Sequence, residues 1–194
     1  MKRIGILGGT FNPPHIGHLI IANEIKYALD LDEVRLIPTA SPPHKTADKD
    51  VTALQRLHMV ELAVEGAEGL TASSFEVGKG GVSYSYDTIS ALKESEPENQ
   101  FFFIIGADMV DILPTWHRID ELVQIVTFIG VNRPGSQGET PYPVTFISIP
   151  EIDLSSTLLR ARLAEGGTIK FLTPPKVESY IRQEGLYGSS TSEK

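Results

Sequence analysis

Residues 3–18 decide the fold, and they read RIGILGGTFNPPHIGH. The stretch from Arg3 to Gly8 is almost continuously apolar, which predicts a strand that is buried on both faces. From Ile16 to Leu29 the apolar residues recur with nearly helical spacing, which predicts an amphipathic helix. The glycines and prolines between these segments predict a tight, stiff turn. A buried strand that leads through such a turn into a helix is typical of the start of a βαβ unit.

The same alternation of strand and helix patterns continues along the chain. We expect strands at 3–8, 34–38, 70–77, 100–105, 126–131 and 144–149. We expect helices at 16–29, 84–95, 120–124, 156–165 and 175–183, a helix that begins after Thr52 as its N-cap, and a short helix that begins at about residue 108. A loop is expected at 114–117. The pattern predicts an α/β protein with a single Rossmann-like, doubly wound, mostly parallel sheet and helices on both faces. In such a sheet, ligands bind outside the carboxyl ends of the strands, where the strand order reverses.

Composition limits the class of protein. The chain has 194 residues, no cysteine and a formal net charge of −8. The lack of cysteine excludes disulfide scaffolds, thiol catalysis and Cys-based zinc sites, and the acidic balance argues against a protein that holds nucleic acid by bulk charge. No apolar run is long enough for a signal-peptide core or a membrane helix, so we expect a cytoplasmic protein with no membrane partner. We also expect one domain at 1–187 and a flexible, Ser-rich tail at 188–194. For the oligomeric state, both a monomer and a homo-oligomer remain alternatives.

The turn after the first strand has the residues of a phosphate site. Gly8 and Gly9 allow backbone N–H groups to approach a phosphate closely. His15 and His18 are three residues apart at the start of a helix and therefore share a face, with Gly17 leaving room for a ligand between them. The alternatives are a simple Gly/Pro turn with two solvent-facing histidines, or a pair of metal ligands. The segment is neither a Walker A motif nor Gly-x-Gly-x-x-Gly, which argues against a dinucleotide-binding oxidoreductase.

The segment Gly8–His18 resembles the signature of the nucleotidylyltransferase superfamily with the His-Ile-Gly-His motif, and most closely its nicotinate-nucleotide adenylyltransferase branch. The resemblance implies that ATP and nicotinate mononucleotide react to deamido-NAD and pyrophosphate, with Mg²⁺ held mainly by the substrate phosphates and no metal ligand from the protein. Sibling phosphopantetheine adenylyltransferases usually carry Thr-x-Gly-His, so His15 points away from them. The alternatives are another phosphorylated acceptor, such as nicotinamide mononucleotide, or a nucleotide-binding module without catalysis.

A second motif lies at Ser155-Ser156-Thr157-Leu158-Leu159-Arg160 and resembles the Ser-Ser-Thr-x-x-Arg segment of the family. Its three hydroxyls open a helix, whose first N–H groups lack partners and whose dipole favours an anion. Arg160 is one turn further along and can extend a bidentate fork to the same phosphate. The alternative is an ordinary capped helix with a surface arginine.

Shorter blocks complete the resemblance, and each also has a purely structural interpretation. Trp116 offers a flat indole for a pyridinium ring, and His117 stands where many relatives have Tyr. Ser85 stands where Thr is common, in a segment that can equally be a turn opening a helix. Asp108 can accept ribose hydroxyls or cap a helix.

The resemblance assigns residues to three roles. The catalytic residues are His15, His18 and Arg160. The ATP-binding residues are Gly8, Gly9, Thr10, Phe11, His15, His18, Gly106, Asp108, Arg133, Ser155, Ser156, Thr157 and Arg160. The residues that bind nicotinate mononucleotide are Asn12, Lys45, Ser83, Ser85, Trp116 and His117.

Overall fold

The sheet of this protein is parallel throughout and has the order β3-β2-β1-β4-β5-β6 in the computed structural model, which describes residues 1–41, 51–132, 139–150 and 152–189. Its strands are β1 (Arg3–Gly9), β2 (Glu33–Pro38), β3 (Leu70–Ala72), β4 (Gln100–Gly106), β5 (Thr127–Asn132) and β6 (Val144–Ser148). The strand order reverses between β1 and β4, which places the expected ligand crevice at their carboxyl ends. The prediction of a Rossmann-like α/β fold is confirmed.

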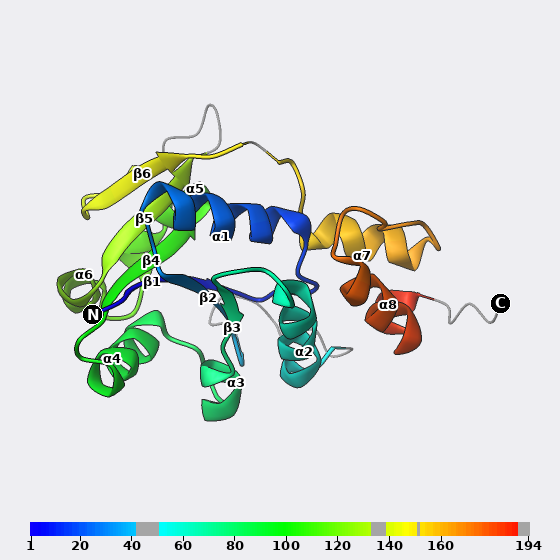
Figure 1. The fold of residues 1–194 in the computed structure, drawn as a ribbon, viewed down its shortest axis with the longest axis horizontal. Coiled ribbons are helices and arrows are strands. Elements are labelled where there is room, and N and C mark those ends of the chain that lie inside the picture. The colour runs from blue at the N-terminus through cyan, green and yellow to red at the C-terminus, as the bar shows by residue number, and fades with distance from the viewer. Residues whose placement is uncertain (42–50, 133–138, 151, 190–194) are drawn as a thin grey trace.

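Helices cover both faces of the sheet (Figure 1). The described helices are α1 (Ile16–Ala28), α2 (Ala53–Val64), α3 (Phe75–Lys79), α4 (Ser85–Ser95), α5 (Ala107–Asp111), α6 (Ile119–Ile125), α7 (Ser156–Ala164) and α8 (Pro175–Gln183), with 3₁₀ turns at Leu113–Thr115 and Leu186–Gly188. Side chains of α1 and α2 pack with one face of the strands in one core, and side chains of α4 and α6 pack with the other face in a second. Because successive strand residues point to opposite faces, Ile6 belongs to the second core and Leu7 to the first.

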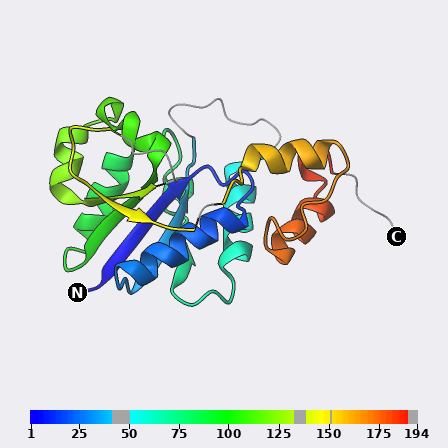
Figure 2. The same ribbon diagram turned by 90° about the horizontal axis from the view of Figure 1, so that it is seen from above.

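A third core joins the C-terminal helices to the rest of the molecule. Met59 and Ala63 of α2 pack there with Leu159 and Leu163 of α7 and Ile181 of α8. These helices therefore lie beyond α2, away from α4 and α6, as both ribbon views show (Figures 1 and 2). The helix α2 thus has one side toward the sheet and one toward the C-terminal helices.

Three local predictions are wrong. The strand expected at 70–77 ends at Ala72, because only three residues pair with β2, and the helix α3 follows. The loop expected at 114–117 begins inside a 3₁₀ turn. Asp108 is not an N-cap, because Gly106 occupies that position and Asp108 lies inside α5.

The predicted boundary at residue 187 stays a prediction. Within the described residues, no helix combines the length and apolarity needed to cross a membrane.

Candidate active site

The turn after β1 places the two motif histidines against each other. The rings of His15 and His18 stack with their centroids 3.7 Å apart, and the ring of Phe11 meets His18 edge-on at 4.9 Å. A Cβ on Gly17 would lie 3.0 Å from His15 Nδ1, so the glycine makes room for the His15 ring. The interpretation that Gly17 leaves space for a ligand between the two rings is therefore wrong, because the rings contact each other directly.

The protonation of His18 follows from its surroundings. Burial lowers the pKa of His18 well below 6.5, and the neighbouring His15 lowers it further. His18 is therefore neutral at physiological pH. Its Nδ1 accepts a hydrogen bond from the backbone N–H of His15 at 3.1 Å, so the ring proton is on Nε2. Nε2 is thus a hydrogen-bond donor without a full positive charge.

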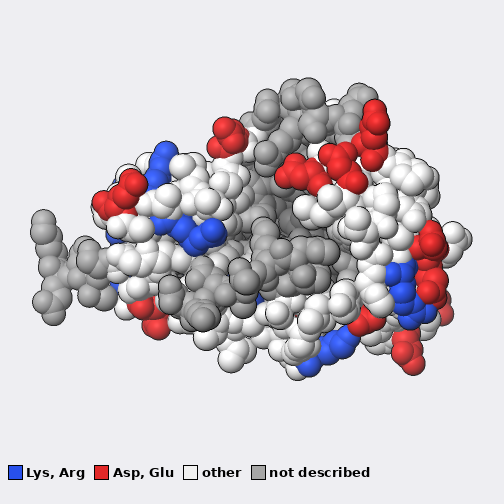
Figure 3. Space-filling view, turned by 180° about the vertical axis from the view of Figure 1, so that it is seen from behind, with Lys and Arg blue, Asp and Glu red and all other residues white. Residues whose placement is uncertain are grey.

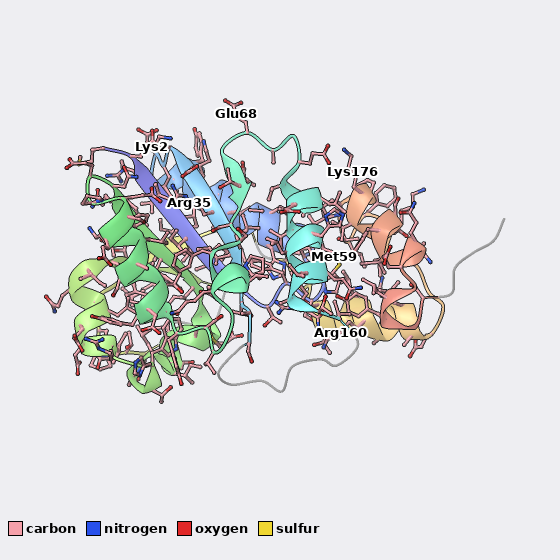
Figure 4. All side chains as sticks on the ribbon, turned by 90° about the horizontal axis from the view of Figure 1, so that it is seen from below. Lys2, Arg35, Met59, Glu68, Arg160 and Lys176 are labelled. Atoms are coloured by element: carbon pink, nitrogen blue, oxygen red, sulfur yellow. The ribbon has the colours of Figure 1, made fainter. Side chains whose placement is uncertain are left out.

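Helix α7 brings the second motif to the first. Arg160 donates from Nη1 to the carbonyl oxygen of Asn12 at 2.8 Å, and the hydroxyl of Ser156 donates to the carbonyl oxygen of Pro13 at 2.8 Å. The two motifs are more than 140 residues apart in sequence (143 and 148 positions for these bonds) and yet share hydrogen bonds. Figure 4 shows Arg160 at the end of the molecule opposite Lys2, which precedes β1, so Arg160 lies toward the carboxyl ends of the strands.

The hydroxyls at the start of α7 have partners within the chain. The Oγ of Ser155 accepts from the N–H of Leu158 and caps the helix, and the Oγ1 of Thr157 accepts from Nη2 of Arg160 at 3.2 Å. The capped helix start leaves an N-terminus with its positive dipole end beside the first motif. The guanidinium of Arg160 is half-buried and has five N–H groups, so it retains donors beyond these two contacts.

Residues near the C-terminal helix also form hydrogen bonds with the turn after β1. The hydroxyl of Thr173 donates to the carbonyl oxygen of Pro14 at 2.8 Å, and the N–H of Ile16 donates to the carbonyl oxygen of Leu172 at 2.9 Å. The hydroxyl of Tyr187 donates to Oδ1 of Asn12 at 2.6 Å. Loop 12–14 is consequently held from several sides by contacts within the chain.

Next to β1 in the sheet, the carboxyl end of β4 carries Gly106, and Asp108 follows in α5; both residues are exposed. Gly106 ends β4 and caps α5, so it lies at the carboxyl edge next to β1. Lys45 and Arg133 lie outside the described residues. Figure 3 views the molecule from behind Figure 1. On this face it shows a hollow with acidic side chains on one side and Lys or Arg side chains on the other.

Trp116 packs against the core with one edge. Its ring meets Phe103 at 5.8 Å and Phe128 at 6.1 Å, both edge-on. Core packing therefore accounts for part of the Trp116 side chain, which is half-buried and keeps part of its ring accessible. Next to it the exposed ring of His117 lies 4.5 Å from Tyr84.

Ser83 and Ser85 lie at the start of α4. The Oγ of Ser83 accepts from the N–H of Ala40 at 2.9 Å, which ties it to the loop after β2. Ser85 is the first residue of α4 and is half-buried.

Two buried charged residues near the site were missed in the sequence. Arg56 of α2 is 5% exposed and donates to backbone carbonyls at the strand ends. Burial raises the pKa of Glu76, which accepts from the hydroxyl of Thr88 at 2.8 Å. Helical spacing could have found Arg56, because Met59, three residues later, is fully buried on the same face.

The donor set of the site fits anions better than a protein-held metal. Among the described residues, no three His, Cys, Asp or Glu side chains gather in a way that could hold a metal ion. The groups that converge here are a neutral imidazole, a guanidinium and a helix N-terminus. Such a site fits a metal ion that reaches the protein bound to substrate phosphates.

Comparison with known proteins identifies the family. The cytidylyltransferase-like family model matches residues 6–162. A protein named "probable nicotinate-nucleotide adenylyltransferase" from Geobacillus thermodenitrificans is 50% identical over 192 residues, which are 99% of this chain and 89% of the relative. One of the same name from Oceanobacillus iheyensis is 50% identical over 188 residues, or 97% of this chain and 98% of the relative.

A solved structure has the same fold. Plasmodium falciparum nicotinic acid mononucleotide adenylyltransferase, complexed with NaAD, superposes with a TM-score of 0.82 at 21% identity, covering 98% of this chain and 99% of that one. Members of this group are nucleotidyltransferases, which generally use a divalent metal ion. The chain belongs to the nicotinate-nucleotide adenylyltransferase family, within the cytidylyltransferase-like nucleotidyltransferases.

Proposed function

We propose that this enzyme transfers the adenylyl group of ATP to nicotinate mononucleotide, which gives deamido-NAD and pyrophosphate. An oxygen of the mononucleotide phosphate attacks the α-phosphorus of ATP, and the bond to the β-phosphate bridging oxygen breaks. The attacking oxygen is already an anion, so no strong base and no covalent intermediate with the protein is required. Catalysis then consists of positioning and of neutralising charge on the transferring group.

The observation that carries this proposal is that the two motifs lie side by side and are joined by hydrogen bonds. The bonds from Arg160 to Asn12 and from Ser156 to Pro13 bring a guanidinium and a helix N-terminus to the turn that holds His15 and His18. These groups are all donors, and none of them is an acid. A triphosphate is the kind of ligand that satisfies such a set.

Each group has a role in the proposal. The Nε2–H of His18 donates to an ATP phosphate, with His15 beside it, and the backbone of Gly8–Phe11 lines the phosphates. Arg160 and the start of α7 bind the β- and γ-phosphates. Gly106 and Asp108 face the nucleoside, and Arg133 is a further candidate for binding ATP. Mg²⁺, held mainly by phosphate oxygens, supplies further charge neutralisation when it is bound.

We assign the acceptor to the segment that opens α4 and to the residues that follow the 3₁₀ turn at Leu113–Thr115. Trp116 stacks with the pyridine ring through its accessible face, and His117, Ser83 and Ser85 are the candidates for the pyridine carboxylate. Asn12 contacts the mononucleotide, and Lys45 meets its phosphate. The printed names of the relatives and of the structural neighbours support nicotinate mononucleotide as the acceptor. A cytoplasmic location, the absence of a nucleic-acid partner and the oligomeric state stay predictions.

The test is an acceptor panel. Purified protein, ATP and Mg²⁺ are mixed with nicotinate mononucleotide, nicotinamide mononucleotide or phosphopantetheine, and pyrophosphate release is followed while the dinucleotide product is identified by mass. We expect nicotinate mononucleotide to give the highest kcat/KM. Preference for phosphopantetheine, or no response to any acceptor, would contradict the proposal.

A further inference from the structure

One arginine side chain links the ends of two neighbouring strands. Arg56 donates from Nη1 to the carbonyl oxygen of Thr10 at 2.7 Å, and from Nη2 to those of Thr39 at 2.6 Å and Ala40 at 3.1 Å. Thr10 follows β1, and Thr39 and Ala40 follow β2. The last backbone link between these segments is the hydrogen bond from Thr39 N–H to the carbonyl oxygen of Gly9. Arg56 therefore extends the connection beyond the end of the sheet.

The contacts of Arg56 are made to neutral groups. Its three hydrogen-bond acceptors are backbone carbonyls, and no carboxylate among the described residues forms an ion pair with it. Burial lowers the pKa of Arg56, although the guanidinium stays protonated at neutral pH. A buried cation with no carboxylate partner among the described residues is costly, and substrates that carry phosphates can offset that cost.

The two loops that Arg56 binds lead to the two halves of the site. On one side, Thr10 adjoins Phe11, whose ring contacts His18. On the other side, the N–H of Ala40 donates to the hydroxyl of Ser83, and the N–H of Ser83 donates to the carbonyl oxygen of Ser41 at 3.0 Å. An unbroken series of contacts therefore runs from the histidine motif through Arg56 to the segment that opens α4.

We infer that Arg56 is a positioning residue that fixes the ATP-binding turn and the acceptor-binding segment relative to each other. The inference rests on the proposed function, because it assigns these two segments to the two substrates. The hydrogen bonds of Arg56 within the described residues go to backbone carbonyls, so Arg56 acts through the groups that it holds. Transfer requires the attacking oxygen and the α-phosphorus to be in line, and a misplacement of about 1 Å can cost about 100-fold in rate.

This role has a distinctive kinetic signature. If Arg56 aligns two half-sites that are each intact, its loss slows the chemical step while each substrate still binds. We expect Arg56→Lys and Arg56→Gln to lower kcat by about 10- to 100-fold, with both KM values changed by less than about threefold. Lysine keeps the charge but is a point donor on a flexible stem, so it does not replace the planar fork that spans two loops.

The matched control is Arg35→Gln. Arg35 is a half-buried arginine of β2 that pairs with Glu96 and Glu33, and Figure 4 shows it toward Lys2 and away from Arg160. We expect this change to lower the melting temperature while kcat and both KM values stay at the wild-type level. Dissociation constants of ATP and of nicotinate mononucleotide, measured separately by calorimetry, check that binding survives in the Arg56 variants.

The outcomes separate this inference from the proposed function. If the wild-type protein forms no deamido-NAD, the proposed function fails, and the inference fails with it. If the wild-type protein is active and Arg56→Lys keeps full kcat, or raises KM by more than tenfold with kcat unchanged, the inference alone is overturned. If neither Arg56 variant folds, it is likewise overturned, because Arg56 then serves the fold rather than the reaction.

Discussion

The hydroxyl of Tyr187 donates a 2.6 Å hydrogen bond to Oδ1 of Asn12, which is 175 positions earlier in the chain. Because Oδ1 is occupied as an acceptor, this bond fixes the orientation of the Asn12 amide. The Nδ2 side of the amide, which carries its N–H groups, then faces away from the phenol. The 3₁₀ turn at Leu186–Gly188 therefore orients the side chain of a residue that we assign to the acceptor.

Tyr187→Phe removes this bond without changing the shape of the ring. We expect KM for nicotinate mononucleotide to rise about 5- to 10-fold, since a hydrogen bond of this kind contributes about 1 kcal/mol. KM for ATP should change much less. Steady-state kinetics for both substrates check this, with Tyr27→Phe as the control, because Tyr27 is 87% exposed. An unchanged KM for the mononucleotide would remove Tyr187 from the site.

Arg160→Ala tests the second motif. The change removes a guanidinium that has donors left for phosphate, so we expect turnover to fall by about 100- to 1000-fold while the far-UV circular dichroism stays native. Arg162→Ala is the matched control, because Arg162 is exposed on the same helix. Near-normal turnover of the Arg160 variant would exclude it from catalysis.

His18→Ala tests the first motif. Loss of the Nε2–H donor should lower kcat by about 100- to 1000-fold, with a folded protein. The control is His58→Ala, since His58 lies on the outer side of α2 against Tyr180. Equal loss in both variants would show that the effect is not specific to the motif.

Gly17→Ala tests the packing of the two histidines. An added Cβ would lie 3.0 Å from Nδ1 and 3.1 Å from Cε1 of His15, so the ring has to move. We expect turnover to drop by at least about tenfold, although alanine favours helix more than glycine does. Gly78→Ala is the control, because its Cβ would meet nothing within 4 Å. Full activity of Gly17→Ala would mean that the stacked arrangement does not matter.

The pH dependence of stability follows from the lowered pKa of His18. Below about 6.5 the unfolded chain binds a proton at this residue, whereas the folded chain binds it only at lower pH. The free energy of unfolding should therefore fall as the pH drops from 7.5 to 5.5, and this part of the fall should be absent in His18→Ala. Urea titrations of both proteins at several pH values measure the difference. Identical pH profiles would contradict a buried, neutral His18.

Much of the fold could be predicted because the spacing of apolar residues along the chain indicates the strands and helices. The buried strand β1 and the helix α8 carry patterns that tertiary contacts reinforce, and α8 has its predicted bounds, Pro175–Gln183. The strand expected at 70–77 failed because its length depends on pairing: β3 has β2 as its one neighbour, and the chain turns into α3 after three pairs. Pairing partners are not visible in a local pattern.

The motifs of the site could also be predicted, but their internal contacts could not. Spacing placed His15 and His18 on one face, but only the structure shows that their rings stack. Arg56 carries no motif, since its role depends on where β1 and β2 end in space. Trp116 was expected to be a ligand platform, and its contacts with Phe103 and Phe128 appear only when β4 and β5 lie side by side.

The hydrogen bonds from residues 156–187 to loop 12–14 have a consequence for biosynthesis. The β1 motif leaves the ribosome more than 140 residues before the groups that hold it, which lie between Ser156 and Tyr187. A growing chain can form much of its sheet before this loop acquires its partners. The site is therefore complete only after α7 and Tyr187 have been made, and a chain cut short before α7 lacks part of it.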